Sequence, residues 1–293
     1  MKIFPLFFIA MIATACAGLP NPAPSAPNAP GAAPAATVAN NAAVAVIAHR
    51  GGAGLAPENT LASFRNGLSL NADYLEMDAH LTQDGVVVII HDDTIDRTTD
   101  GAGRIHDFAL ADLQKFNAAS KYANGTTERQ MIPTLAQVLD TVKPTKARIE
   151  VEIKVPPWGR DAGIEQKILD EISSRQMLDR VQISSFDFNV LKEVKKLNPR
   201  MKTVALVTAG FYRANDVSQP AKIAEQIQAL GAEFFASNKD FLSPGLVEEM
   251  RQRKIQVEVW TVDSDTEMKK FIAMGVDGII TNRPDTLNRV LGR

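Results

Sequence analysis

The sequence has a single cysteine, Cys16, among its 293 residues. One cysteine excludes an intrachain disulfide framework, and its early position argues against a catalytic thiol in the folded domain. The sequence also has no excess of charge of either sign, because 32 Lys and Arg residues are balanced by 34 Asp and Glu residues. This near-neutral balance gives no electrostatic reason to expect nucleic acid as a partner.

The N-terminal apolar run is too short to span a bilayer comfortably, since a transmembrane helix needs about 20 residues. It covers residues 3–15 and follows Lys2, as in a signal peptide. It ends in Ala13-Thr14-Ala15-Cys16, which resembles a bacterial lipoprotein signal, although Ala13 stands where Leu is usual. We predict a signal peptide over residues 1–15, cleavage before Cys16 and lipidation of that cysteine; ordinary cleavage at a small-residue site is the alternative. We therefore expect an exported protein, either periplasmic or a membrane-anchored lipoprotein.

Residues 16–43 are rich in Ala, Pro and Asn. Such a segment cannot bury a core and favours extended, polyproline-like conformations. We interpret it as a linker that holds a domain away from a membrane. The folded part is then 44–293, about 250 residues, which is the usual size of one (β/α)8 barrel.

Within 44–293, short apolar runs alternate with amphipathic ones, the pattern of βα units. This pattern predicts an α/β fold, a (β/α)8 TIM barrel. A doubly wound open sheet is the alternative, but no Gly-rich phosphate fingerprint follows the first strand. The predicted barrel strands are 44–48, 74–78, 148–154, 181–184, 203–207, 234–236, 256–260 and 278–280, and the predicted helices include 60–69, 134–142, 163–175, 189–197, 221–230, 244–253 and 266–274.

Residues 74–92, YLEMDAHLTQDGVVVIIHD, predict a strand, a tight turn at Gln83-Asp84-Gly85 and a return strand. A short turn joins only antiparallel strands, so the return arm 86–90 should lie outside a parallel barrel. Antiparallel register brings His91 to about the level of Asp78. The connection that follows, about 93–147, is long and polar and predicts a small insertion after this hairpin.

Carboxylates stand at the predicted C-terminal ends of two strands, where the active site of a TIM barrel lies. Strand alternation puts Glu76 and Asp78 on one face, and Glu152 follows on the next barrel strand. Charges buried without partners are costly, so these groups should face a metal, one another or an anion. Three hard oxygen ligands predict one divalent cation, Mg²⁺ or Ca²⁺, rather than Zn²⁺.

The remaining polar groups at the same strand ends are two cations and two histidines. Arg50 and Lys154 suit an anionic ligand, most simply a phosphate. His49 and His91 have an ordinary pKa of ~6.5, which suits acid and base catalysis near neutral pH. Together with a metal, this set predicts a site that cleaves phosphodiesters.

Five further side chains receive weaker expectations. Trp260 should face the barrel mouth, where it either contacts the substrate as a wall for glycerol or only packs. Glu58 is either near the metal and substrate or a plain loop residue. His80 is expected to be exposed to solvent, His106 to lie on the surface, and Glu150 to pair with a basic residue.

Several short motifs, in this order, resemble the glycerophosphodiester phosphodiesterase family over nearly all of 44–293. The resemblance implies a TIM barrel, a metal bound by Glu76, Asp78 and Glu152, and catalytic roles for His49 and His91. It also implies phosphate and substrate contacts by Arg50 and Lys154. One departure is Asn282, where many members have Asp, and we expect no ligand there. The motifs are His49-Arg50-Gly51, Pro57-Glu58-Asn59-Thr60, Glu76-x-Asp78, Thr82-x-Asp84-Gly85, His91-Asp92, Arg97-Thr98-Thr99, Glu152-Ile153-Lys154, Ser185-Phe186, Trp260-Thr261-Val262 and Gly275-x-Asp277-Gly278-Ile279-Ile280-Thr281.

The reaction implied by the resemblance is hydrolysis of a glycerophosphodiester to glycerol 3-phosphate and an alcohol. Two alternatives remain. One is a phospholipase-type phosphodiesterase that acts on a lysophospholipid or phosphoinositide, and the other is a non-catalytic surface binding protein on the same barrel. The expected partner is a small-molecule substrate, with no nucleic acid and with membrane contact only through a lipid anchor on Cys16.

Overall fold

The computed structural model describes residues 44–123, 128–216 and 218–293. The predicted signal peptide, Cys16 and the linker 16–43 lie outside these residues and stay predictions. Among the residues described, no helix combines the length and the apolar character needed to cross a membrane.

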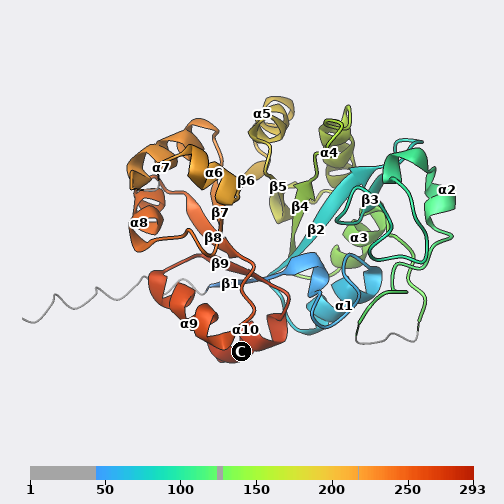
Figure 1. Cartoon of the computed structure of the whole chain (residues 1–293), viewed down its shortest axis with the longest axis horizontal. Coiled ribbons are helices and arrows are strands. Elements are labelled where there is room, and N and C mark those ends of the chain that lie inside the picture. The colour runs from blue at the N-terminus through green and yellow to red at the C-terminus, as the bar shows by residue number, and fades with distance from the viewer. Residues whose placement is uncertain (1–43, 124–127, 217) are drawn as a thin grey trace, which may run out of the picture. The chain divides into compact units, whose positions relative to one another are not determined.

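Nine strands form one sheet, and all of them except β3 run parallel to their neighbours. The sheet closes on itself because β1 pairs with both β2 and β9, which confirms the predicted TIM barrel. Helices lie outside the ring of strands (Figure 1). The barrel strands are β1 (Ala45–Ala48), β2 (Tyr74–Leu81), β4 (Arg148–Ile153), β5 (Val181–Ser185), β6 (Lys202–Val207), β7 (Phe234–Asn238), β8 (Gln256–Trp260) and β9 (Gly278–Thr281).

Several of the helices that follow these strands begin at side chains that cap them. Thr60 caps the first helix and Thr134 the helix after β3, and each forms a capping box with the residue three positions later, Ser63 or Gln137. Each such cap stabilises its helix by about 1 kcal/mol. The predicted helices correspond to α1 (Leu61–Ser69), α3 (Leu135–Val142), α4 (Ile164–Ser174), α5 (Phe188–Leu197), α7 (Pro220–Ala229), α8 (Pro244–Gln252) and α9 (Asp265–Met274).

Three helices lie outside the predicted ranges: α2 (Leu110–Leu113), α6 (Ala209–Ala214) and α10 (Pro284–Leu291). They are the shortest helices or equal the shortest predicted one, so few apolar positions repeat in each. The 3-10 turns η1 (His49–Gly51), η2 (Ile105–Asp107) and η3 (Leu178–Arg180) also stand between elements.

The hairpin after β2 has the predicted form. Strand β3 (Val87–Ile89) runs antiparallel to β2, and among the strands of the sheet it pairs only with β2. Strand β2 extends three residues beyond its predicted end at Asp78 because β3 continues the pairing there. Ala79 pairs with Ile89, and Ile90 N donates to Asp78 O at 2.9 Å. The same register puts Ile90 opposite Asp78 and His91 opposite Met77. His91 is therefore one residue away from the predicted level of Asp78.

The connection after this hairpin contains a small apolar core of its own. Val88 and Ile90 of the return arm pack there against Ile95, Ile105 and Leu113. The alternate side chains of the arm, Val87 and Ile89, pack in the barrel's main core instead. The arm therefore lies between two cores, with its faces divided by strand alternation.

The barrel interior holds a polar layer below the expected site. Gln182 Nε2 donates to Glu150 Oε2 at 2.7 Å and to Glu258 Oε1 at 3.0 Å, and all three side chains are buried. The expectation that Glu150 pairs with a basic residue is therefore wrong, because its partner is an amide beside a second carboxyl. Burial raises the pKa of both carboxyls, that of Glu258 to about 7, and the charge of Glu258 adds to the shift of Glu150.

This layer predicts that stability falls as pH rises from 5 to 8. The pKa of Glu258 is raised by folding from 4.5 to about 7, so its contribution is fully present below pH 4.5 and is lost as pH rises through 7. Glu258→Gln keeps an acceptor for Gln182 but cannot ionise. We expect the variant to lose less stability than the wild type over this range, by roughly 2 kcal/mol, as measured by urea unfolding at each pH.

The control is Glu248→Gln on the solvent side of α8, which removes an exposed carboxylate. It should follow the wild-type pH dependence. Parallel curves for the wild type and Glu258→Gln would show that Glu258 does not carry the effect.

Candidate active site

Three carboxylates meet at the C-terminal end of the barrel. Glu76 and Asp78 lie on β2, and Glu152 lies on β4 directly beside Asp78 in the strand register. One oxygen of each carboxylate lies within 4.8 Å of one oxygen of each of the others, and all three side chains are buried. Strand alternation and parallel pairing are thus sufficient to gather this acidic triad.

The electrostatics of the acidic triad fit a cation. Burial, with Asp78 and Glu152 nearby, raises the pKa of Glu76 well above its usual value. Burial also raises the pKa of Glu152 to about 7, against the lowering effect of Lys154. The pKa of Asp78 is lowered instead, because Lys154 and Arg50 outweigh its burial. A set of buried, mutually repelling oxygen ligands can hold one divalent cation such as Mg²⁺ or Ca²⁺.

Two basic side chains flank the acidic triad. Lys154 Nζ lies 2.9 Å from Asp78 Oδ1 and 2.7 Å from Glu152 Oε1. The backbone N of Arg50 donates to Glu76 Oε2 at 2.8 Å, and its guanidinium Nε lies 3.5 Å from Asp78 Oδ2. These side chains place positive charge beside the carboxylates, where an anionic group of a ligand could also bind.

The turn after β1 brings Arg50 to this position by an uncommon backbone path. Arg50 has φ 52°, in the left-handed region, and Gly51 follows with φ 81°. A Cβ on Gly51 would lie 2.5 Å from Ser63 Oγ and 2.8 Å from Ser63 C. Only glycine fits there without a shift of α1, so the tight approach of α1 holds the turn in place.

Glu58 lies beside the acidic triad but is not one of its members. Its carboxylate accepts from Arg50 Nη1 at 2.9 Å and from Arg97 Nη2 at 2.7 Å. Arg97 Nε also donates to Asp92 Oδ2 at 2.6 Å. Glu58 and Arg97 therefore link the turn after β1 to the end of the hairpin.

His49 hydrogen-bonds to Asn282, a residue for which we expected no role. His49 Nδ1 lies 2.7 Å from Asn282 Oδ1, and Asn282 Nδ2 donates to Asp263 Oδ2 at 2.8 Å. A carboxylate can only accept, so the amide oxygen of Asn282 faces His49 and must accept from Nδ1–H. This leaves Nε2 of His49 as the unprotonated ring nitrogen. Burial, aided by Arg50, lowers the pKa of His49 to about 4, so the ring is neutral at pH 7.

Barrel closure brings Asn282 to His49. Ala48 of β1 is the register partner of Thr281 of β9, so the next residue of each strand also lies side by side. The only signal in the sequence was that Asn282 stands two residues after the predicted strand 278–280, at the end of the barrel where active sites lie.

His91 is oriented in a similar way at the end of the hairpin. Its Nδ1 lies 2.6 Å from Asp92 Oδ1, which leaves Nε2 available. Burial lowers the pKa of His91, and Asp78 and Asp92 oppose that shift. His80 is 3% exposed, so the expectation of solvent exposure is wrong. It is the register partner of Val88 on β3, and its Nε2 lies 3.2 Å from His91 O.

Trp260 and Phe186 form an aromatic wall beside these groups. Their rings meet edge to face with centroids 5.5 Å apart, and Trp260 Nε1 donates to Ala236 O at 3.2 Å. Both rings line a cavity of about 110 Å³, which we call the site cavity. Its other lining residues include His49, Arg50, Glu76, His91, Glu152 and Lys154. His106, by contrast, lies away from this cavity with its side chain 59% exposed.

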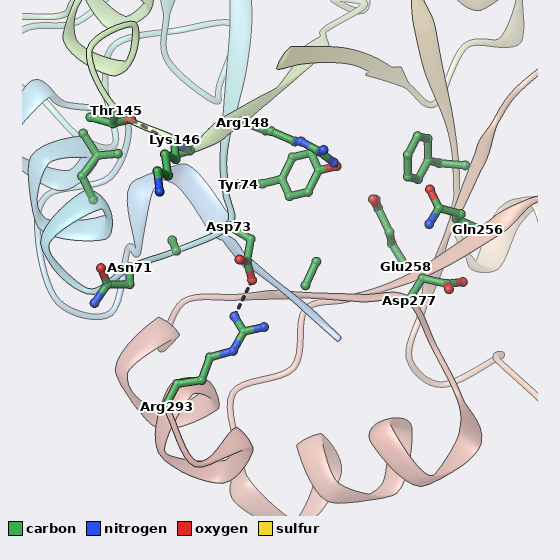
Figure 2. A pocket seen from close by; sticks show the side chains of 15 residues that line it. Asn71, Asp73, Tyr74, Thr145, Lys146, Arg148, Gln256, Glu258, Asp277 and Arg293 are labelled. Atoms are coloured by element: carbon green, nitrogen blue, oxygen red, sulfur yellow. Dashed lines mark hydrogen bonds and ion pairs between the residues drawn. The ribbon is translucent and has the colours of Figure 1, made fainter. Parts of the chain in front are cut away.

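A larger cavity of about 760 Å³ lies at the other end of the barrel, around the N-terminal residues of the strands (Figure 2). Two of its charged groups form an ion pair, and a third bonds to a tyrosine. Arg293 Nη1 lies 2.6 Å from Asp73 Oδ2, and Arg148 Nη1 donates to Tyr74 Oη at 2.9 Å. Among its lining residues there is no histidine and no group of three carboxylates like the acidic triad. The smaller cavity is therefore the candidate active site.

Comparison with known proteins shows a consistent similarity to one family. The sequence model of the glycerophosphoryl diester phosphodiesterase family matches residues 49–286. A glycerophosphodiester phosphodiesterase from Caldanaerobacter subterraneus subsp. tengcongensis is 37% identical over 246 residues, covering 83% of this chain and 95% of that protein.

Solved structures give the same result. An Oleispira antarctica phosphodiesterase, solved with the product sn-glycerol-3-phosphate, has TM-score 0.72 and 26% identity over 85% of this chain and 97% of its own. A glycerophosphodiester phosphodiesterase from Thermotoga maritima has TM-score 0.67 and 25% identity, covering 85% of this chain and 98% of its own.

The acidic triad predicts that a divalent cation stabilises the fold. Adding Mg²⁺ or Ca²⁺ to chelator-treated protein should raise the melting temperature, because a ligand at 100 times its Kd stabilises the native state by about 2.7 kcal/mol. Glu152→Gln removes one charged ligand and should abolish most of the rise in differential scanning fluorimetry.

Asp179→Asn, at a side chain that is 91% exposed, serves as the control and should keep the full rise. Two results would contradict a cation at the acidic triad: a melting temperature that does not change when Mg²⁺ or Ca²⁺ is added, or a rise that is still present in Glu152→Gln.

Proposed function

The chain belongs to the glycerophosphoryl diester phosphodiesterase family, and we propose that it hydrolyses glycerophosphodiesters to glycerol 3-phosphate and an alcohol. One observation carries this proposal: the acidic triad, two cations and two oriented histidines surround a single cavity. The glycerol 3-phosphate in the Oleispira antarctica structure supports the same product.

The substrate phosphate fits between the two basic side chains and the acidic triad. Arg50 and Lys154 would bind its oxygens, and Trp260 would contact the glycerol carbons. A divalent cation bound by Glu76, Asp78 and Glu152 would supply Lewis-acid chemistry, lowering the pKa of a nearby hydroxyl and offsetting negative charge on the phosphate. The residues of the chain then have to move two protons.

We assign His49 as the first base. Its Nδ1 is engaged by Asn282, so Nε2 carries the free lone pair and can accept a proton from the glycerol 2-hydroxyl. As that oxygen forms a bond to phosphorus, the bond from phosphorus to the leaving alcohol oxygen breaks. The product of this step is a cyclic glycerol phosphate and an alkoxide that needs a proton.

We assign His91 as the acid that supplies this proton. Asp92 accepts from Nδ1 of His91 and stabilises its charged form, as the carboxylate does in a catalytic triad. Arg97 holds Asp92 in place. In the second step the roles reverse. His91 takes a proton from water as the water oxygen bonds to phosphorus, the bond from phosphorus to the glycerol 2-oxygen breaks, and His49 returns its proton to that oxygen.

Release of glycerol 3-phosphate from glycerophosphocholine and glycerophosphoglycerol tests this proposal directly. We expect release that EDTA abolishes and that falls by about 10²–10⁴ in kcat in His49→Ala and in His91→Ala, the usual worth of acid–base catalysis. His106→Ala, at an exposed histidine, is the matched control and should keep wild-type turnover.

Near-normal turnover in either site variant would contradict the assignment of that histidine. Release that EDTA does not affect would contradict the metal dependence. No release from any glycerophosphodiester, with metal supplied, would favour the non-catalytic binding protein. Activity confined to lysophospholipids or phosphoinositides would favour the phospholipase-type alternative.

The hydrogen bond from His49 to Asn282 yields a separate prediction. Asn282→Ala removes the acceptor that fixes Nδ1–H, so His49 can rotate or adopt the wrong tautomer. We expect kcat to fall by about 10–100-fold with little change in KM, since a misplaced base acts on the chemical step. Asp263→Asn should cause part of this loss, because the Asn282 amide is then no longer held in one orientation.

Asn189→Ala, at an exposed position on α5, is the control and should leave kcat unchanged. A rise in KM at constant kcat in Asn282→Ala would show that Asn282 binds substrate rather than positioning His49.

A further inference from the structure

The site cavity is too small for a whole glycerophosphodiester. At about 110 Å³ it lies well below the roughly 300–1,000 Å³ of pockets that enclose a complete small ligand. Phosphate and glycerol would fill it, so the alcohol on the far side of the phosphorus must extend into an adjoining space.

One groove adjoins the site cavity directly. It has a volume of about 430 Å³ and lies between the loops after β5 and β6. Phe186 and Leu206 line both spaces. A second cavity near the site, of about 280 Å³ beside Glu58 and Arg97, has no lining residue in common with the site cavity. The first groove, which we call the aromatic groove, is thus the direct route out of the site.

Phenylalanine rings and one carboxylate dominate the chemistry of the aromatic groove. Phe188 and Phe211 meet at an angle of 64° with centroids 5.8 Å apart, and Phe186 stands at the junction with the site cavity. Phe186 is 40% exposed and lines the groove together with Phe188 and Phe211, so its ring is open to a ligand there. No Lys, Arg or His lines this groove.

Asp187 gives the aromatic groove its only formal charge. One of its oxygens accepts from Asn189 N at 2.8 Å and so caps α5. Within the residues described, no Lys, Arg or His forms an ion pair with it at 4.0 Å or less. An acyl chain in the groove would have to desolvate this carboxylate without offering it a partner, which is unfavourable.

We propose that the aromatic groove is the subsite for the leaving alcohol and that it selects a cationic head group, above all a quaternary ammonium. The faces of aromatic rings attract cations, and a quaternary ammonium is held in this way in aromatic cages. Asp187 adds a compensating charge. A trimethylammonium group has more apolar surface than a primary ammonium and loses less hydration, so it should be preferred. The proposal rests on the proposed function, because it assigns the other half of the same substrate.

Head-group preference tests the proposal. We would measure kcat/KM for glycerophosphocholine, glycerophosphoethanolamine and glycerophosphoglycerol, which differ only in the leaving alcohol. The wild type should prefer the choline diester over the glycerol diester by about 10-fold, within the range that cation–π contacts provide. Asp187→Asn and Phe188→Leu should each lower that ratio by about 3–10-fold.

Both variants preserve the local fold. Asn caps helices about as well as Asp, so Asp187→Asn removes the charge and keeps α5 capped. Phe188→Leu keeps apolar volume and removes the ring. Glu193→Gln, which removes a carboxylate from the solvent side of the same helix, should keep the wild-type ratio.

The outcomes separate this proposal from the proposed function. Hydrolysis of all three diesters with no preference, or with a preference that survives Asp187→Asn, overturns the subsite and leaves the proposed function standing. A kcat/KM that rises with acyl length in a series of 1-acyl glycerophosphocholines, and that loses this dependence in Phe188→Leu but not in Asp187→Asn, shows that the groove takes an acyl chain and overturns the cationic subsite.

If no diester is hydrolysed, the proposed function is overturned. Binding measurements then test whether the aromatic groove is a cationic subsite. Calorimetric titration of the wild type and of Asp187→Asn with glycerophosphocholine and glycerophosphoglycerol then measures the same ratio as Kd values. Tighter binding of the choline diester that weakens in Asp187→Asn supports the subsite, and equal binding of the two diesters overturns it.

Discussion

Repulsion among the carboxylates of the acidic triad is the constraint on which the site depends. Three such groups within 4.8 Å of one another, out of contact with bulk water, would not stay ionised by themselves. Lys154 and Arg50 offset part of the charge, and each is held in turn by a neighbouring element. The turn after β1, the hairpin after β2 and the end of β4 all help to offset the negative charge of the acidic triad.

Much of the fold follows from local patterns in the sequence. The alternation of apolar and amphipathic runs and the turn at Asp84-Gly85 were sufficient to predict the barrel, its main helices and the return arm outside it. Residues that share a strand, such as Glu76 and Asp78, or lie on consecutive barrel strands, such as Asp78 and Glu152, were also brought together as expected. In each case the contact is set by a short stretch of chain or by one parallel pairing.

The contacts that the sequence did not predict come from more distant parts of the fold. Asn282 meets His49 across 233 positions because β9 pairs with β1, and nothing local to Asn282 indicates this. Glu150, expected to pair with a basic residue, instead accepts from Gln182 beside it on β5, and the same amide donates to Glu258, which the alternation of a single strand cannot identify. His80, expected to be exposed, is buried, and its ring lies against the backbone oxygen of His91 at the end of the hairpin.

The two cores on either side of the return arm also affect the order in which the parts of the site unfold. His49 stands on the barrel, whereas His91, Asp92 and Arg97 stand where the return arm meets the small core formed with Ile95, Ile105 and Leu113. A core of so few side chains opens at a lower free energy than the barrel, as a separate cooperative unit. Activity should therefore be lost on warming before the barrel unfolds, because the proposed proton donor His91 leaves while the acidic triad remains in place.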